Sequence, residues 1–235
     1  MKTRLFICVC ILFSLLSCSS SEKEQLETAL AFADTNRAEL EKVLEYYKND
    51  SLKLKAAIYL IENMPLYYTY KGSDLDSLHI ALEQYAVSDS YDKHLEYLKR
   101  FPYRNLFKEY DAKVITSEYL IENIEYSFKV WRETPWGKYV SFDNFCEFIL
   151  PYRIKDEPLT HWKKDFYHRF KPVLDSLYQG TDVVEATSCL SNYATSLHWK
   201  YQNELTGPHL SAQLLLELQL GDCTSIADFG CYMLR

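Results

Sequence analysis

The chain has 235 residues, of which 48% are hydrophobic and 25% are charged, a composition that excludes an intrinsically disordered protein. Its net charge of −7 at pH 7 argues against a nucleic-acid-binding surface and against a polybasic membrane surface. Only 6 glycines and 7 prolines are present, too few for the turn every ~8–12 residues that β-sandwiches and barrels need, so the composition predicts a mainly α-helical protein.

The first residues have the pattern of an export signal. Lys2 and Arg4 precede an apolar run over residues 5–16. This run is shorter than the roughly 20 apolar residues that span a bilayer, so it is typical of a secretory signal and not of a transmembrane helix. It ends in Leu15-Leu16-Ser17-Cys18, a tetrad that resembles the bacterial lipoprotein signal.

The lipoprotein resemblance implies that residues 1–17 are removed and that Cys18 becomes the lipidated first residue of the mature chain. Two or three acyl chains would then anchor the protein, because each buried methylene contributes about 0.8 kcal/mol. Ser19, and not an aspartate, follows the cysteine, and under this resemblance that favours sorting to the outer membrane. The alternative is an ordinary cleaved signal in which Cys18 is incidental. We therefore expect a cell-envelope protein whose lipid contacts a membrane, on either the periplasmic or the surface side.

Residues 23–134 contain one glycine and two prolines, and apolar residues at helical spacing predict a series of amphipathic helices. Asn36 and Glu39 have the spacing of a capping box at the start of the first helix. A turn is predicted at 49–51, and the next helix is expected to end at Pro65. Two further helices are predicted by the stripes Leu75, Leu78, Leu82 and Tyr85, and Ile121, Ile124, Phe128 and Trp131.

An aromatic-rich segment follows and includes Leu150-Pro151-Tyr152-Arg153. A helix is predicted to begin at Pro158 and to kink or restart at Pro172. The residues that recur in it at helical spacing are Leu159, Trp162, Phe166, Phe170, Val173 and Leu174. We interpret them as core and not as a carbohydrate- or peptide-binding platform, because stripes at this spacing usually face a core. Gly180 is expected to end this helix and to mark a domain boundary.

After the boundary, Asp182 and Glu185 again have capping-box spacing. Further on, Ser211 can cap a helix over 212–218, which is expected to end at Leu220-Gly221 because glycine favours helix termini. Asp222 can then cap a helix over 223–234 that begins with Cys223.

The position of Cys223 indicates a reactive thiol. A cysteine in the first turn of a helix faces unpaired N–H groups and the positive end of the helix dipole, which stabilise a thiolate. A charged Asp222 would offset part of this effect. Ala227, Gly230 and Leu234 lie on the same face, beneath the thiol. This face of small residues lets another backbone approach closely, as required if the base of a nucleophile sits on a neighbouring strand.

The segment Gly-Asp-Cys-Thr-Ser-Ile-Ala-Asp over 221–228 and the pair Leu234-Arg235 resemble the nucleophile helix of the transglutaminase-like superfamily. In that family a Gly-x-Cys turn starts the core helix and a Leu-Arg pair closes it. A helix containing Trp199, a loop at Gly207-Pro208 and the amphipathic helix before residue 221 fit the same resemblance.

The resemblance implies a helical region over 18–180, followed over 181–235 by the helical half of a papain-like α+β domain. Cys223 would be the nucleophile and would form a thioester with an amide or peptide carbonyl of a protein or peptide substrate. The family uses Cys, His and Asp in that chain order, whereas all six histidines here precede Cys223. We therefore expect a fragment without the β half and its catalytic His and Asp, inactive on its own. The alternative is a non-catalytic lipoprotein whose helices present a binding surface, with Cys223 merely structural.

Metal and cofactor sites have no sequence support. The chain has no Cys-x-x-Cys, no His-Glu-x-x-His and no glycine-rich phosphate loop, so neither a metal nor a cofactor is expected. Cys223 and Cys231 would lie ~12 Å apart on one helix, too far for a disulfide. Cys189 can pair with either Cys146 or Cys231, and the sequence does not decide between them.

Overall fold

The structure is a computed structural model that describes residues 23–87, 93–203 and 205–235. The protein is mostly helical, with 67% helix and 6% strand, which confirms the predicted mainly α class. The predicted signal segment and Cys18 lie outside the described residues. None of the helices in the described ranges is both long enough and apolar enough to cross a bilayer.

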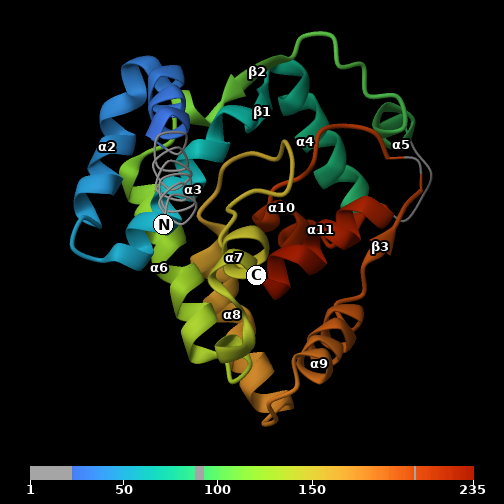
Figure 1. Ribbon diagram of the computed structural model, residues 1–235. Helices are drawn as coiled ribbons and strands as arrows, with labels where there is room; N and C mark the ends of the chain where they lie inside the picture. Colours follow the sequence, from blue (N-terminus) through green and yellow to red (C-terminus); the bar gives the residue numbers. More distant parts are fainter. Residues whose placement is uncertain (1–22, 88–92, 204) are drawn as a thin grey trace, which may run out of the picture.

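The first half of the chain ends in its longest described helix, α6, against which α2 and α3 pack. Its elements are, in chain order, a helix over 23–33, η1 (Asp34–Asn36), α2 (Arg37–Tyr46), α3 (Ser51–Asn63), η2 (Met64–Leu66), β1 (Tyr68–Lys71), α4 (Ser73–Ala86), α5 (Lys93–Leu98), β2 (Phe107–Tyr110), η3 (Asp111–Lys113) and α6 (Ser117–Glu133). Strands β1 and β2 pair antiparallel, with Tyr68 opposite Tyr110. In Figure 1, α2 and α3 lie on one side of the molecule, whereas α4 and α5 lie on the other.

The second half contributes the lower helices in Figure 1 and the C-terminal helix α11. Its elements are η4 (Gly137–Tyr139), α7 (Phe142–Asn144), the π-helical turn η5 (Phe145–Ile149), α8 (Trp162–Leu177), α9 (Val183–Thr195), β3 (Lys200–Tyr201), α10 (Ala212–Leu218), β4 (Leu220–Gly221) and α11 (Cys223–Leu234). The short strands β3 and β4 pair in parallel. Helix α11 contacts α8, α9 and α10, which places Cys223 in the C-terminal group of helices.

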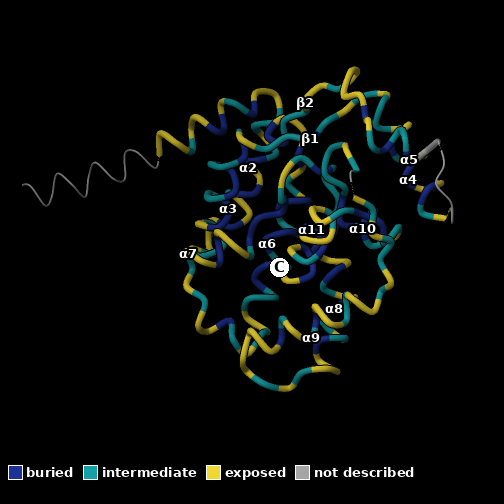
Figure 2. Tube along the Cα trace, turned by 90° about the vertical axis from the view of Figure 1, so that its right-hand side faces the viewer, coloured by how far each residue is buried: buried dark blue, intermediate teal, exposed yellow. Residues whose placement is uncertain are grey.

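Three apolar clusters hold these helices together. The first joins α2, α3 and α6 with the segment around η5, and Figure 2 shows its buried residues in the interior of the trace. The second joins α8, α9, α10 and α11, and the third packs α4 and α5 against Leu220. The aromatic stripe of α8 belongs to the second cluster, because Trp162, Phe166 and Phe170 are each 3% exposed. The interpretation of that stripe as core is therefore confirmed.

Most predicted helix starts are confirmed by their caps. Each capping side chain accepts a hydrogen bond from a backbone N–H in the first turn, where the helix itself supplies no acceptor. The pairs are Asp182 with Val184 at 2.7 Å, Ser211 with Leu214 at 3.2 Å and Asp222 with Ser225 at 2.9 Å.

The capping box predicted at Asn36 and Glu39 is wrong, because both side chains make long-range contacts. The Asn36 amide donates to the carbonyl groups of Ala112 at 3.0 Å and Ile115 at 2.9 Å. The Glu39 carboxylate accepts from the backbone N–H and from the hydroxyl of Ser117, both at 2.8 Å. Glu39 therefore satisfies the start of α6 and not of its own helix, and the two residues fasten α2 to η3 and α6.

Helix α8 begins at Trp162, four residues after the start predicted at Pro158. The carboxylate of Glu157 accepts from the backbone N–H groups of Ile154 and Lys155, both at 2.7 Å. These bonds close a local loop with the carboxylate at its centre. The segment before Trp162 is therefore held in a non-helical conformation.

Of the two effects predicted for Pro172, a kink or a restart, the restart does not occur, because α8 continues from Trp162 to Leu177. Pro172 and His168, whose carbonyl loses its helical partner at a proline four residues on, are both exposed. Water can therefore satisfy that carbonyl, and the loss is tolerated on the solvent side.

Two expectations near the C-terminus are also corrected. Helix α10 ends at Leu218, and its C-cap is Gln219, in the left-handed conformation with φ of 49°, and not Gly221. Trp199 lies outside the helices, just before β3. Its ring packs at 4.8 Å from that of Phe229, so this aromatic contact with α11 accounts for its position.

Candidate functional site

A tight connection from β4 into α11 positions Cys223. The Asp222 carboxylate accepts from the backbone N–H of Ser225 at 2.9 Å and from its hydroxyl at 3.0 Å. A Cβ atom at Gly221 would lie only 2.2 Å from the Cβ of Ser225, so this approach of strand to helix requires glycine. The predicted importance of Gly221 stands, but its cause is this close approach and not helix termination.

Cys223 is accessible, whereas Cys146 is not. All four cysteines in the described ranges are free, so the disulfides considered for Cys189 do not form in this structure. Cys223 and Cys231 are exposed and Cys146 is buried. Burial raises the pKa of Cys146 to about 12, which keeps it as an unreactive thiol at neutral pH.

The helix face beneath Cys223 is open. Ala227 and Leu234 are exposed, Ile226 is 40% exposed, and a Cβ atom at Gly230 would meet no heavy atom within 4 Å. Ala227 and Gly230 thus leave this face accessible to another backbone. Within the described ranges no strand covers the face, and no hydrogen bond joins Cys223 to a histidine.

A histidine–aspartate pair on the other side of α11 was missed by the sequence analysis. His209 Nδ1 lies 2.6 Å from Asp228 Oδ2, and Asp228 is only 7% exposed. The backbone N–H of His209 donates to the Asp156 carboxylate at 2.9 Å. The hydrogen bond from Asp228 raises the pKa of His209, because the carboxylate stabilises the protonated ring. The residues are far apart in the chain, and no motif indicates that they meet.

This pair has the arrangement of a base and its orienting acid, but it does not face the predicted nucleophile. Asp228 follows Cys223 by five residues, which places the two side chains about 140° apart around the helix. Cys223 therefore points to the open face, whereas Asp228 points to the side covered by the loop that carries His209.

A cleft of about 220 Å³ opens beside the His209–Asp228 pair. It lies between α4, α5, the loop after β3 and the first turns of α11. Its lining residues are Leu78, Leu82, Leu98, Leu205, Thr206, Gly207, His209, Leu210, Asp222, Thr224, Ser225 and Asp228. Cys223 is not among them, so the structure presents two separate features on one helix: an exposed thiol and a lined cleft.

The donor sets in the described part of the chain do not suit a metal ion, because no three His, Cys, Asp or Glu side chains converge there. Comparisons with protein-family models, with curated proteins and with solved structures find no match to this chain.

Proposed function

We propose that Cys223 is the nucleophile of a Cys-dependent acyl transferase or amide hydrolase of the transglutaminase-like type, in a lipid-anchored protein of the cell envelope. The observation that supports this most directly is the exposed thiol in the first turn of the 12-residue helix α11. Asp222 bonds to the N–H of Ser225, and the N–H groups of Cys223 and Thr224 make no hydrogen bond to described residues. These N–H groups lie at the positive end of the helix dipole, beside the sulfur.

The reaction follows from this nucleophile. The thiolate attacks an amide carbonyl carbon, a C–S bond forms, the C–N bond breaks, and the amine leaves after taking up a proton. Water or a second amine then attacks the thioester, which releases the acyl group and restores the thiol. The resemblance assigns the proton transfers to a His and an orienting Asp that follow the nucleophile in chain order. They would belong to a β half packed on the open face at Ala227 and Gly230.

Alkylation by iodoacetamide at pH 7 tests the proposed nucleophile. Cys231 is a matched control, because it is also exposed and lies eight residues further along the same helix. We expect Cys223 to react about tenfold faster than Cys231, since only Cys223 faces the N–H groups of the first turn. The rates are measured by mass spectrometry on the Cys231→Ser and Cys223→Ser variants, each of which leaves one thiol of this pair. Equal rates would refute the proposed reactivity of Cys223.

The anchor is proposed from the sequence around Cys18 and is tested separately. We expect the wild-type protein to incorporate labelled palmitate and to partition into detergent, because acyl chains on Cys18 bury many methylenes. The Cys18→Ser variant should lose the label and move to the aqueous phase. A Cys8→Ser variant is the control, because residue 8 lies in the segment that is removed. If the label stays on the Cys18→Ser variant, the lipid is attached elsewhere or the signal is an ordinary one.

A second candidate function is a binding lipoprotein without catalysis, and the cleft beside His209 and Asp228 favours it. In that case α11 supplies polar side chains to a ligand site, and the thiol of Cys223 has no chemical role. Slow alkylation of Cys223 together with ligand binding in the cleft would select this function over acyl transfer.

A further inference from the structure

The cleft beside α11 has one apolar wall that the fold holds in place. Five leucines form this wall: Leu78, Leu82, Leu98, Leu205 and Leu210. The loop that closes it is fixed by Thr206, whose backbone N–H and hydroxyl both donate to the Leu98 carbonyl at 2.8 Å. Gly207 adopts φ of 142°, and a Cβ atom there would lie 3.2 Å from a methyl of Leu78. The loop therefore lies directly against α4.

The opposite wall is polar and carries negative charge. It consists of Asp222, Thr224, Ser225 and Asp228 of the α11 segment together with His209. No lysine or arginine among the described residues lines the cleft or forms an ion pair with either aspartate. Asp228 accepts one hydrogen bond, at Oδ2, and its Oδ1 has no partner in the described ranges. A carboxylate that is 7% exposed thus keeps an acceptor free beside the cavity.

We propose that this cleft binds a compact aliphatic cation, with an ammonium group on the free oxygen of Asp228 and a branched hydrocarbon body against the leucines. The charge favours a cation, because two carboxylates face the cleft and only His209 can offset one of them. The volume of about 220 Å³ suits a body of five or six heavy atoms, since a 150 Å³ apolar cavity holds benzene. The proposal does not depend on acyl transfer, because Cys223 lies on another side of α11.

Three probes with the same branched skeleton test the charge preference. They are isoamylamine, isoamyl alcohol and isovalerate, which carry an ammonium, a hydroxyl and a carboxylate at pH 7.5. Binding to the full chain is followed by NMR chemical-shift titration. We expect the amine to bind at least about tenfold more tightly than the alcohol, as one charge-assisted hydrogen bond allows, and isovalerate not to bind.

Two variants separate binding from folding. Asp228→Asn removes the charge and keeps an acceptor for His209, and should weaken amine binding about tenfold. Asp222→Ser keeps a helix cap while it removes the second charge, so it should weaken binding less and remain folded. Glu217→Gln is the matched control, because Glu217 is exposed on neighbouring α10 and does not line the cleft. Equal binding of the three probes, or unchanged amine affinity in both aspartate variants, would overturn the proposal.

The ammonium group could come from a free amine or from the amino terminus of a peptide. A peptide that begins with leucine carries a similar branched skeleton next to a terminal ammonium group. Tighter binding of this peptide than of isoamylamine would identify peptide amino termini as the ligand, and weaker binding would identify small amines. Either result requires that Asp228→Asn reduce the affinity, and a peptide that binds this variant unchanged would count against the cleft.

Discussion

Replacing Arg153 with methionine is expected to destabilise the fold by about 3–5 kcal/mol, because the change leaves a buried carboxylate without its cation. Arg153 is 3% exposed and Asp111 is fully buried. Arg153 Nε and Nη2 donate to the two oxygens of Asp111 at 2.7 and 2.6 Å. In the variant the Tyr152 hydroxyl, at 3.1 Å, would be the one side-chain donor left to that carboxylate among the described residues.

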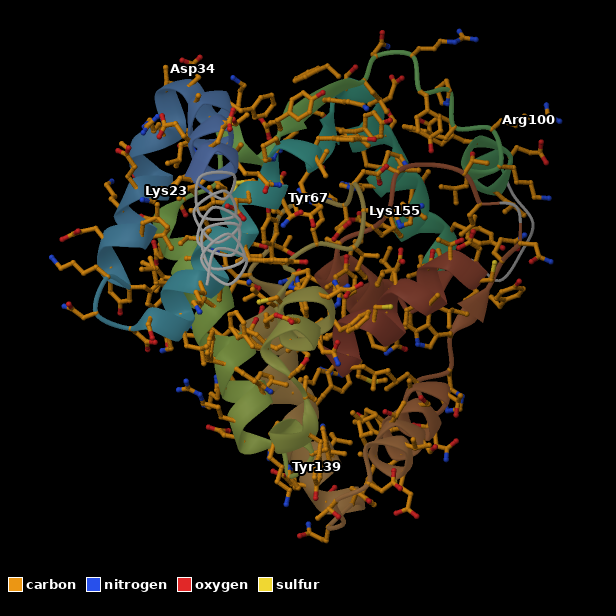
Figure 3. The ribbon with its side chains drawn as sticks, in the orientation of Figure 1. Lys23, Asp34, Tyr67, Arg100, Tyr139 and Lys155 are labelled. Atoms are coloured by element: carbon orange, nitrogen blue, oxygen red, sulfur yellow. The ribbon has the colours of Figure 1, made fainter. Side chains whose placement is uncertain are left out.

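The same residues connect the two halves of the chain, which makes the effect global. Arg153 also donates to the Glu157 carbonyl, and its own carbonyl accepts from Arg235 at 2.9 Å. The Trp162 indole donates to the Tyr152 carbonyl at 2.8 Å. In Figure 3 the labels Tyr67 and Lys155 mark the neighbourhood of this loop. Helices α8 and α11 are thus both tied to backbone carbonyls of the loop after η5, and the Arg153–Asp111 pair holds that loop against η3.

Urea unfolding monitored by circular dichroism measures the change. Arg104→Met is the control, because Arg104 is exposed, and it should alter the free energy of unfolding by less than about 0.5 kcal/mol. The double variant Arg153→Met with Asp111→Leu should recover at least about 2 kcal/mol, since the carboxylate that the pair held at Asp111 is gone and the remaining carboxylate, at Glu157, keeps its backbone hydrogen bonds to Ile154 and Lys155. A single variant that loses under 1 kcal/mol, or a double variant less stable than the single one, would show that the ion pair is not decisive.

The sequence predicted the helices better than it predicted what their polar residues do. Amphipathic spacing and caps are local, because a cap needs only residues within one turn, and the caps at Asp182, Ser211 and Asp222 are therefore confirmed. Asn36 and Glu39 have the same local spacing but contact other elements. Capping spacing shows only that a side chain can reach the N–H groups of its own helix. Tertiary contacts can give the same side chain other hydrogen-bond partners.

The candidate site shows the same difference between features that depend on local sequence and features that depend on tertiary contacts. The place of Cys223 in the first turn of a helix was predictable, because Gly221 and Asp222 precede it in the sequence. The pair formed by His209 and Asp228 was not predictable, because it depends on how one loop packs against α11. The role of Arg153 was hidden for the same reason, since Asp111 lies 42 residues earlier in the chain.

Lys163 gives the second large expected effect. Replacing it with methionine should destabilise the protein by about 3 kcal/mol, because two short hydrogen bonds from a buried amino group disappear. Lys163 is 5% exposed, and its Nζ donates to the Ser127 hydroxyl at 2.7 Å and to the Ile149 carbonyl at 2.6 Å. The carbonyls of Leu150 and Pro151 lie at 3.4 Å. The amino group thus donates to backbone carbonyls at the end of η5.

The neighbouring residue supplies a matched control. Lys164 is exposed and lies 3.6 Å from Glu122, and such surface ion pairs contribute about 0–1 kcal/mol. Lys164→Met should therefore change the free energy of unfolding far less than Lys163→Met, although both replace a lysine in the first turn of α8 with methionine. Similar losses in the two variants would show that net charge, and not the buried hydrogen bonds, accounts for the effect.

The pH dependence tests the burial of Lys163 directly. Burial lowers the pKa of Lys163, so the unfolded chain binds more protons than the folded chain between that lowered pKa and the usual lysine value of about 10.4. In this interval a rise in pH favours the folded state of the wild type, and Lys163→Met lacks this contribution. The stability difference between wild type and variant should therefore widen as the pH is raised toward 10 in urea unfolding experiments. A difference that narrows with pH would mean that the folded protein holds this proton more tightly than the unfolded chain does.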